Sequence, residues 1–190
     1  MGELVLSGKG MGDRRSDAGQ DSAEEVCQYL TFSVGEERLA MSITAVKEII
    51  ETPQITRVPM TPEYIRGVIN LRGSVVPVVD LGARLGRGVL TLTRRSCIVL
   101  VEVRSGSGDG HVLGMLVDEV KNILDISRED IKPPPEFGSE IRTDFIEAMG
   151  RVEDVFVIIL SMDHVLSIQE LAALRRISEE AASSGLDVDP

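Results

Sequence analysis

Apolar and polar residues alternate in a series of short segments along this chain, and that pattern limits the folds it can adopt. Alternation puts every second side chain on one face of an extended strand, and glycine or proline turns separate the segments. The first such segment carries Leu30, Phe32 and Val34, and a turn and a second segment follow over residues 35–43. The sequence therefore predicts a half-buried hairpin at the start of the ordered chain.

Two blocks of apolar strands follow the same logic, at roughly residues 28–81 and 97–160. No strand is followed by a long helix in the regular order of a doubly wound sheet. Many short strands with Gly and Pro turns favour small barrels over a large sheet. We predict a mainly all-β fold in which each block forms one barrel, and we expect Val155–Leu160 to be a fully buried strand.

Helical patterns interrupt the strands briefly. Thr61-Pro62-Glu63 combines an N-cap hydroxyl, a proline at the first helical position and an acid in the first turn. Ser167 and Glu170 have the spacing of a capping box. We expect short helical segments at residues 46–50, 61–67, 127–130 and 145–150, and a C-terminal helix that begins after Ser167.

The two ends of the chain are polar and lack periodic apolar positions. Residues 1–25 cannot bury enough surface to offset the entropy of ordering, so we expect a flexible N-terminal tail. Residues 175–190 should hold the end of the C-terminal helix and a polar tail that starts near Glu179. The ordered domain is then predicted over residues 26–174.

Composition excludes several classes of function. The formal net charge of −11 argues against binding to nucleic acid, which requires a basic surface. The longest apolar run has six residues, far below the roughly 20 that span a bilayer. The N-terminus also lacks the apolar region of a secretory signal. We expect a cytoplasmic protein without membrane insertion.

Catalytic or metal chemistry has few candidate residues. The chain holds two histidines, His111 and His164, and two cysteines, Cys27 and Cys97, and none of them has ligand or triad spacing. The cysteines are expected to be buried small hydrophobes, and the Gly-Ser-Gly-Asp-Gly stretch at 106–110 a hairpin loop. We predict no enzymatic activity, no metal and no cofactor, with a site built from Asp and Arg alone as the open alternative.

One apolar stretch, "GVINLRGSVVPVVDL", is interrupted by Arg72 and Gly73. Gly73 gives the turn a permissive backbone, so Arg72 can be held at the surface to bind a carboxylate or helix-end carbonyls of a partner. The alternative is an ion pair within the domain that braces the hairpin. Residues 63–95 carry six arginines against Glu63 and Asp80, and this zone could face an acidic protein partner.

Several longer motifs resemble the CheW family of bacterial chemotaxis coupling proteins. They are "YLTFSVGEERLAMSITAVKEII", "RVPMTPEYIRGVINLRGSVVPVVDL", "GMLVDEVKNIL", "IKPPPEF" and "FVIILSMDHVLS". The resemblance extends from about Val26 to Leu174 and is most specific over Asn70–Leu81. It implies two five-stranded SH3-like β-barrels packed side by side, without enzymatic activity.

The resemblance also implies partners. Such proteins bind the helical cytoplasmic tip of chemoreceptors in a groove between the barrels and dock on the regulatory domain of the histidine kinase CheA. They are monomers alone and are recruited to receptor arrays at the membrane. By position, the residues that would line or support the receptor groove are Val46, Gly67, Arg72, Val101 and Gly114, and Phe137 would lie near the kinase.

Alternatives stay open for these residues and for the pathway. Helical apolar spacing makes Val46 equally a core residue, and Gly67 and Gly114 can be backbone requirements whatever partner is met. An adaptor of a related chemosensory pathway, controlling motility, differentiation or a second messenger, would have the same motifs.

Overall fold

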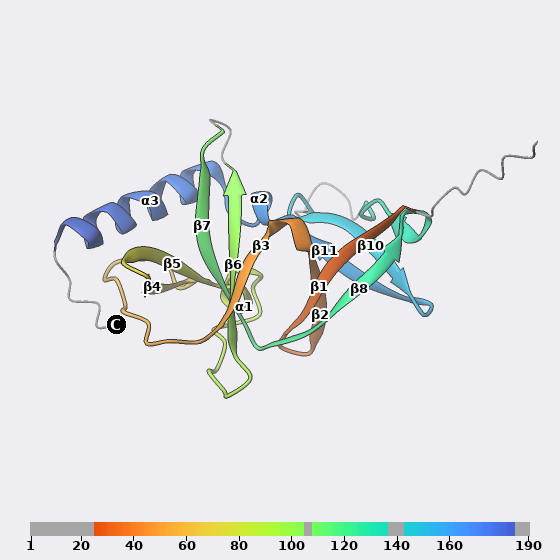
Figure 1. The fold of residues 1–190 in the computed structure, drawn as a ribbon, viewed down its shortest axis with the longest axis horizontal. Coiled ribbons are helices and arrows are strands. Elements are labelled where there is room, and N and C mark those ends of the chain that lie inside the picture. Colours follow the sequence, from red (N-terminus) through yellow and green to blue (C-terminus); the bar gives the residue numbers. More distant parts are fainter. Residues whose placement is uncertain (1–24, 105–107, 137–142, 185–190) are drawn as a thin grey trace, which may run out of the picture.

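The structure, a computed structural model, describes residues 25–104, 108–136 and 143–184. Two curved sheets lie side by side, and a C-terminal helix covers one of them (Figure 1). The six-stranded sheet has the order β8-β1-β2-β11-β10-β9 and the five-stranded sheet the order β3-β6-β7-β5-β4. The mainly β, two-barrel fold class is confirmed, with the two-residue strand β9 as a sixth member of one sheet.

The strands of the six-stranded sheet are β1 (Val26–Val34), β2 (Glu37–Ser42), β8 (Glu119–Ser127), β9 (Ile131–Lys132), β10 (Ile146–Val152) and β11 (Val155–Leu160). Those of the five-stranded sheet are β3 (Val46–Glu51), β4 (Ile65–Leu71), β5 (Ser74–Asp80), β6 (Cys97–Arg104) and β7 (Gly110–Val117). The helices are α1 (Leu81–Arg84), α2 (Met162–Val165) and α3 (Ile168–Ser183), with 3₁₀ turns η1 (Ile43–Ala45) and η2 (Arg128–Asp130).

The division into blocks 28–81 and 97–160 differs from the observed topology. Strands β3 to β7 form one sheet, and this unit is inserted between β2 and β8 of the other. Alternation identifies strands but not their partners, so the long connection between β5 and β6 looked like a boundary. The chain passes between the two sheets through short connections. The 3₁₀ turn η1 connects β2 to β3, and Asp118 alone connects β7 to β8. The Asp118 carboxylate accepts a hydrogen bond from Gly35 N at 2.6 Å.

Three of the predicted helical segments are strands or turns. Residues 46–51 form β3, residues 61–64 form a turn before β4, and residues 146–152 form β10. In β3 a register shift after Val46 pairs Val46 with Val101 and Glu48 with Leu100, so Val46 shares a face with Ile49 and Glu48 shares the other face with Ile50. Pairing with a neighbouring strand thus overrides the helical spacing of Val46 and Ile50. At residues 127–130 a 3₁₀ turn forms without the predicted side-chain cap.

Other local predictions hold with changed limits. The capping box at Ser167 and Glu170 is confirmed, but α3 continues to Ser183, beyond the tail boundary expected at Glu179. Strand β11 is confirmed, although Val155 and Phe156 at its start are exposed. Both cysteines are free and half-buried.

The five-stranded sheet closes through the chain that follows β3. Residues 46–51 pair with β6, and five residues later Thr56 exchanges two backbone hydrogen bonds with Val68 of β4, at 2.8 and 2.9 Å. The chain from β3 to Thr56 therefore connects the two outer strands of this sheet, β3 and β4. Gly67 permits this contact, because its φ is +144° and a Cβ there would lie 2.2 Å from the Thr56 carbonyl oxygen.

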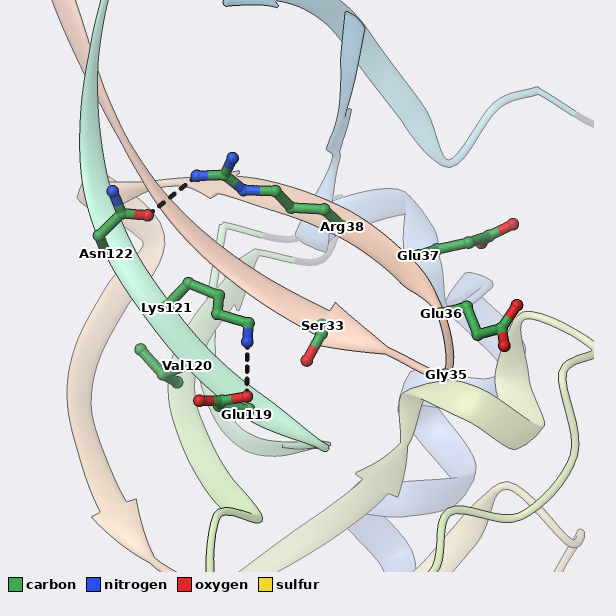
Figure 2. A pocket seen from close by; sticks show the side chains of 9 residues that line it. All are labelled: Ser33, Gly35, Glu36, Glu37, Arg38, Glu119, Val120, Lys121 and Asn122. Carbon is green, nitrogen blue, oxygen red and sulfur yellow. Dashed lines mark hydrogen bonds and ion pairs between the residues drawn. The ribbon is translucent and has the colours of Figure 1, made fainter. Parts of the chain in front are cut away.

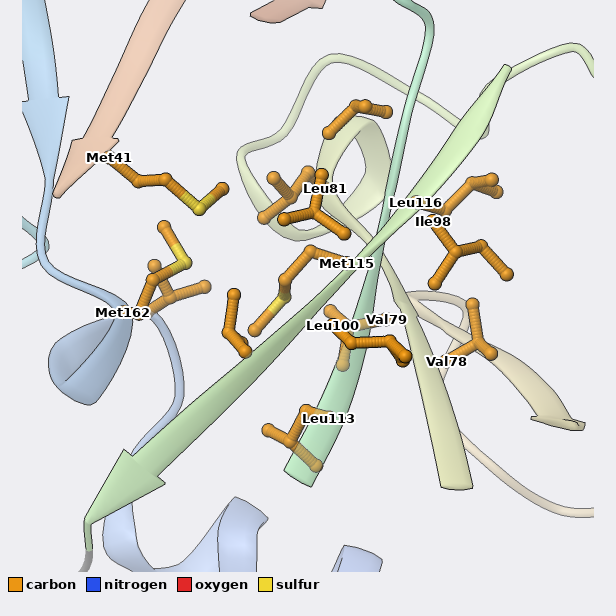
Figure 3. Close-up of a cluster of buried hydrophobic side chains, with 14 of the residues drawn as sticks. Met41, Val78, Val79, Leu81, Ile98, Leu100, Leu113, Met115, Leu116 and Met162 are labelled. Atoms are coloured by element: carbon orange, nitrogen blue, oxygen red, sulfur yellow. The ribbon is translucent and has the colours of Figure 1, made fainter. Parts of the chain in front are cut away.

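The larger of two hydrophobic clusters among the described residues extends across both sheets. Its members include Leu30, Phe32 and Met41 from the six-stranded sheet and most of the inward side chains of the five-stranded sheet. Figure 3 shows Met41, Met115 and Met162 converging where the two sheets meet. Thioether side chains fill irregular gaps well, so the interior of the seam between the barrels is occupied by the protein's own side chains.

A buried carboxylate fixes the end of the "VVDL" segment. Asp80 is fully buried and accepts hydrogen bonds from Arg66 Nη1 at 2.8 Å, Leu90 N at 3.0 Å and Ala83 N at 3.1 Å. Removing one partner of a buried ion pair costs about 3–5 kcal/mol, because the other charge is left without compensation. Asp80 therefore links β4, β5, the start of α1 and the loop before β6.

Replacing Gly67 by alanine tests the closure of the five-stranded sheet. The left-handed backbone costs about 1–2 kcal/mol for a residue with a Cβ, and overlap with the Thr56 carbonyl adds a similar amount. We expect Gly67→Ala to lower the free energy of unfolding, measured in urea, by about 3 kcal/mol. Gly86 has a φ of +74°, and a Cβ there would have no atom within 4 Å, so Gly86→Ala should show the backbone cost alone. Equal losses in the two variants would contradict the role assigned to Gly67.

Candidate functional site

Arg72 occupies the tip of the β4–β5 hairpin. Leu71 pairs with Ser74, so Arg72 and Gly73 form a two-residue turn, with φ of +51° and +88°. Two successive positive φ values define the turn type that matches the twist of a hairpin, in which the first position favours Asn, Asp or Gly. Gly73 N also donates to Asn70 Oδ1 at 2.8 Å. An arginine is thus held in a backbone conformation that its own side chain does not favour.

The Arg72 guanidinium pairs with a carboxylate at the other edge of the same sheet. Its Nη2 donates to both oxygens of Glu48 on β3, at 2.8 and 3.0 Å, and these hydrogen bonds raise the pKa of Arg72. The side chain is nevertheless 71% exposed. The intradomain brace foreseen as an alternative is therefore present, and much of the guanidinium still faces solvent.

The other predicted receptor-site residues lie in the same sheet but are mostly buried. Val46 is half-buried and is directly paired with Val101, which is fully buried. Gly67 and Gly114 flank Val78 on either side in the sheet. A Cβ on Gly114 would lie 2.7 Å from Ile98 Cγ2, so the absence of a side chain there serves packing. Phe137 lies outside the described residues.

The arginines of residues 63–95 are largely paired within the protein. Five of the six contact carboxylates, in the pairs Arg66–Asp80, Arg72–Glu48, Arg84–Glu170, Arg87–Glu37 and Arg95–Glu119. Glu37 and Glu119 belong to the six-stranded sheet, so two of these pairs join the loop before β6 to the other barrel. The local excess of positive charge in the sequence is thus mostly neutralised by acids from distant segments.

A hollow of about 430 Å³ opens at the junction of the two sheets, next to the predicted site. Ala45 and Glu102 line it, and they neighbour Val46 and Val101 in the chain. Its charged lining consists of Glu102, Arg104, Glu147 and Asp163. We call this the acidic hollow, because three carboxylates face one guanidinium.

The acidic hollow is shaped by contacts between the barrels. Arg104 N of β6 donates to Asp163 Oδ1 of α2 at 2.9 Å. Burial, with the nearby charge of Asp163, raises the pKa of Glu147 despite the opposing effect of His164. A cation in this hollow would offset the charge of Asp163, and the three carboxylates of the lining give the hollow an electrostatic preference for a cation.

A larger hollow, of about 680 Å³, lies between the β1–β2 turn and the start of β8. Figure 2 shows two contacts among its polar side chains: Lys121 Nζ contacts Glu119 at 2.6 Å and Arg38 donates to Asn122 at 3.0 Å. None of the predicted site residues lines it. We assign no ligand to this hollow.

Two further features bear on function. Within the described residues, no three His, Cys, Asp or Glu side chains gather closely enough to hold a metal ion. None of the described helices has the length and apolar character needed to cross a membrane.

A polar cluster anchors α3 beside the five-stranded sheet. Glu170 accepts hydrogen bonds from Ser167 N at 2.6 Å, Tyr64 Oη at 2.9 Å and Arg84 Nη2 at 3.3 Å. Burial, and then the bond to Glu170, raises the pKa of Tyr64 to about 12. Burial alone would raise the pKa of Glu170 as well, but these donors and the Arg84 charge outweigh it and lower the pKa.

A family model described as a CheW-like domain matches residues 28–170, which include strands of both sheets. The chain belongs to the CheW-like family. A chemotaxis protein CheW of Rhizobium meliloti (strain 1021) is 36% identical over 146 residues, covering 77% of this chain and 91% of that protein. Protein FrzA of Myxococcus xanthus is 30% identical over 148 residues, covering 76% of this chain and 88% of the relative.

A solved structure agrees with the fold. The scaffolding protein TtCheW from Thermoanaerobacter tengcongensis superposes with a TM-score of 0.68 at 33% identity, covering 77% of this chain and 96% of that chain. The family resemblance seen in the sequence motifs is confirmed.

Sequence reasoning missed the carboxylates that surround the predicted CheW-like site. Glu48 lies on the face of β3 opposite to Val46 because the pairing register shifts between them, and simple alternation does not predict that shift. Glu102, Glu147 and Asp163 come from three different elements, and no local pattern predicts their convergence.

The lowered pKa of Glu170 predicts a pH-dependent contribution to stability. Its pKa in the folded state lies below the value of about 4.3 expected in the unfolded chain. The stabilisation is therefore fully present above that value and is lost as pH falls through the folded pKa. We expect Glu170→Gln to be less stable than wild type at pH near 7, with the difference shrinking at acidic pH, in urea unfolding across that range. Glu179 pairs with Arg175 on the exposed face of α3, so Glu179→Gln serves as a control with a small effect. A Glu170→Gln difference that did not change with pH would contradict this account.

Proposed function

We propose that this protein is a non-enzymatic adaptor that couples chemoreceptors to the histidine kinase CheA in chemotaxis. The observation that carries the proposal is the family match through both sheets, together with relatives named chemotaxis protein CheW and a neighbour named a scaffolding protein. The receptor tip and the kinase regulatory domain are the proposed partners, and receptor arrays at the membrane the proposed location.

The geometry supports a binding mode in which the receptor lies across the junction of the barrels. The interior of the seam is filled, so a partner would rest on the surface at the acidic hollow and the edge of β3. Arg72 would then contribute its exposed guanidinium at the end of that edge. Val101, Gly67 and Gly114 would support this surface from behind, and Val46 would contribute its exposed part.

A scaffold changes kinase output only by favouring one arrangement of the assembly, so its contacts need differential affinity rather than great strength. Moderate interfaces suffice when many of them act together in an array. An adaptor of a different chemosensory pathway is the second candidate, because the similarity to FrzA shows that the family includes proteins not named CheW.

Reconstitution tests the coupling role. The purified chain is added to CheA and chemoreceptors in membranes, and kinase autophosphorylation is followed with and without receptor. We expect receptor control of the kinase to depend on this chain. Kinase activity indifferent to it would contradict the proposal, and coupling only to receptor and kinase of another chemosensory system would support the second candidate.

A charge swap separates the two roles of Arg72. In Arg72→Glu the ion pair with Glu48 becomes a repulsion at the surface, so we expect a far-ultraviolet spectrum and melting temperature close to wild type but at least about tenfold weaker receptor binding. Adding Glu48→Arg restores the pair with reversed charges. Receptor binding should stay weak in this double variant, measured by pull-down and titration. Recovery of binding in the double variant would show that Arg72 acts only as a brace.

A further inference from the structure

A third hollow, of about 150 Å³, lies beside α2 and is lined by Arg84, Leu85, Phe145, His164 and Val165. Arg84 and Leu85 follow β5 of the five-stranded sheet, whereas Phe145 precedes β10 of the other sheet. This hollow therefore also lies at the junction of the barrels. Asp163 lines the acidic hollow and the next residue, His164, lines this one, so α2 contributes to both.

Arg84, which lines this hollow, has a buried donor without a partner among the described residues. Its Nη2 binds Glu170 at 3.3 Å, and its guanidinium carbon lies 5.4 Å from the centre of the Tyr64 ring. Among the described residues, nothing accepts a hydrogen bond from Arg84 Nε, which is closed to solvent. A buried donor without an acceptor costs about 1–3 kcal/mol, and more when the group is charged. Such a group in a native fold requires an explanation.

The lining defines what kind of acceptor fits. Leu85, Phe145 and Val165 supply apolar walls, the Arg84 guanidinium supplies donors and His164 supplies an imidazole ring. His164 Nδ1 is already bound to Ser161 Oγ at 2.8 Å, which leaves Nε2 as the ring nitrogen available to a ligand. A carboxylate on a short methylene stem matches this combination, because guanidinium–carboxylate bonds are among the strongest in proteins and the stem suits the apolar walls.

We propose that this hollow binds a carboxylate side chain, of the length of glutamate, presented by a partner polypeptide at the junction of the barrels. The identification of that polypeptide as a chemoreceptor rests on the proposed function, whereas the ligand class rests on Arg84 and its surroundings. Because Arg84 Nε is closed to solvent, binding of the partner's carboxylate involves a small shift of the guanidinium toward the hollow. The hydrogen bond from Arg84 Nη2 to Glu170 would be kept. The partner would then carry an acid for this hollow and a base for the acidic one.

Nuclear magnetic resonance of the arginine side chains tests this directly. The ¹⁵N-labelled full chain is titrated with sodium propionate, an analogue of the glutamate side chain, against sodium chloride at matched ionic strength. We expect a saturable shift of the Arg84 Nε–Hε signal with propionate. The signals of Arg66, which is bound to Asp80, and Arg87, which is bound to Glu37, serve as internal controls and should not respond.

Two variants probe the hollow itself. Leu85→Phe fills it and His164→Ala removes its imidazole ring, and each should weaken the propionate response by about tenfold or more while leaving the Tyr64–Glu170 contact in place. An unchanged Arg84 signal, or a response that is linear and equal in Leu85→Phe, would overturn the proposal.

A titration with a chemoreceptor tip fragment in place of propionate tests the carboxylate site separately from the proposed adaptor function. A saturable Arg84 shift with the fragment supports a protein-borne carboxylate. Binding of the fragment without any Arg84 shift refutes the carboxylate site on the partner and leaves the proposed function intact. Saturation with propionate but no binding of the fragment contradicts the proposed function and supports a site for free small carboxylates instead.

Discussion

The closure of the five-stranded sheet is the constraint on which the candidate site depends. Residues 46–56 leave the edge of β6 and reach the edge of β4, and this path brings Glu48 within hydrogen-bonding distance of Arg72 at the far hairpin. The closure is sterically demanding, since the Thr56 carbonyl lies where a Cβ of residue 67 would be. Gly67, which resembles a partner-site residue by motif, therefore acts on the backbone, because it allows the chain after β3 to reach β4.

Because side chains fill the seam between the barrels, a groove for a partner can lie only on the surface of the junction. Met41, Met115 and Met162 pack in the interior, and β1 is buried on both faces because Leu30 and Phe32 face the shared core while Tyr29 joins a smaller cluster in the six-stranded sheet. A partner cannot enter between the barrels without displacing this core. Two surface hollows lie beside α2: the acidic hollow is lined mainly by polar and charged side chains, whereas the smaller one combines apolar walls with Arg84 and His164.

Local features of the sequence predicted the strands well and their arrangement poorly. Alternation over Leu30, Phe32 and Val34 reports one buried face, and it cannot show which strand lies alongside or that Thr31 on the opposite face is also buried. Apolar spacing at Val46, Ile49 and Ile50 was compatible with a helix until pairing with β6 decided it. Arg72 stood out because it breaks an apolar run, whereas Arg84 did not, since its surroundings come from Tyr64, Glu170 and His164, which are brought together only by the fold.

The shared core also bears on how an adaptor can transmit a change. Because one hydrophobic cluster spans both sheets, and the Arg87–Glu37 and Arg95–Glu119 pairs tie them again at the surface, the two barrels should respond to a load as a single body. Close-packed interiors resist gradual deformation. A partner bound at α2 would then be coupled to a second partner elsewhere mainly through the orientation of the whole domain. Signalling by such a body depends on which neighbours it holds and at what angle, and a flexible internal pathway is not required.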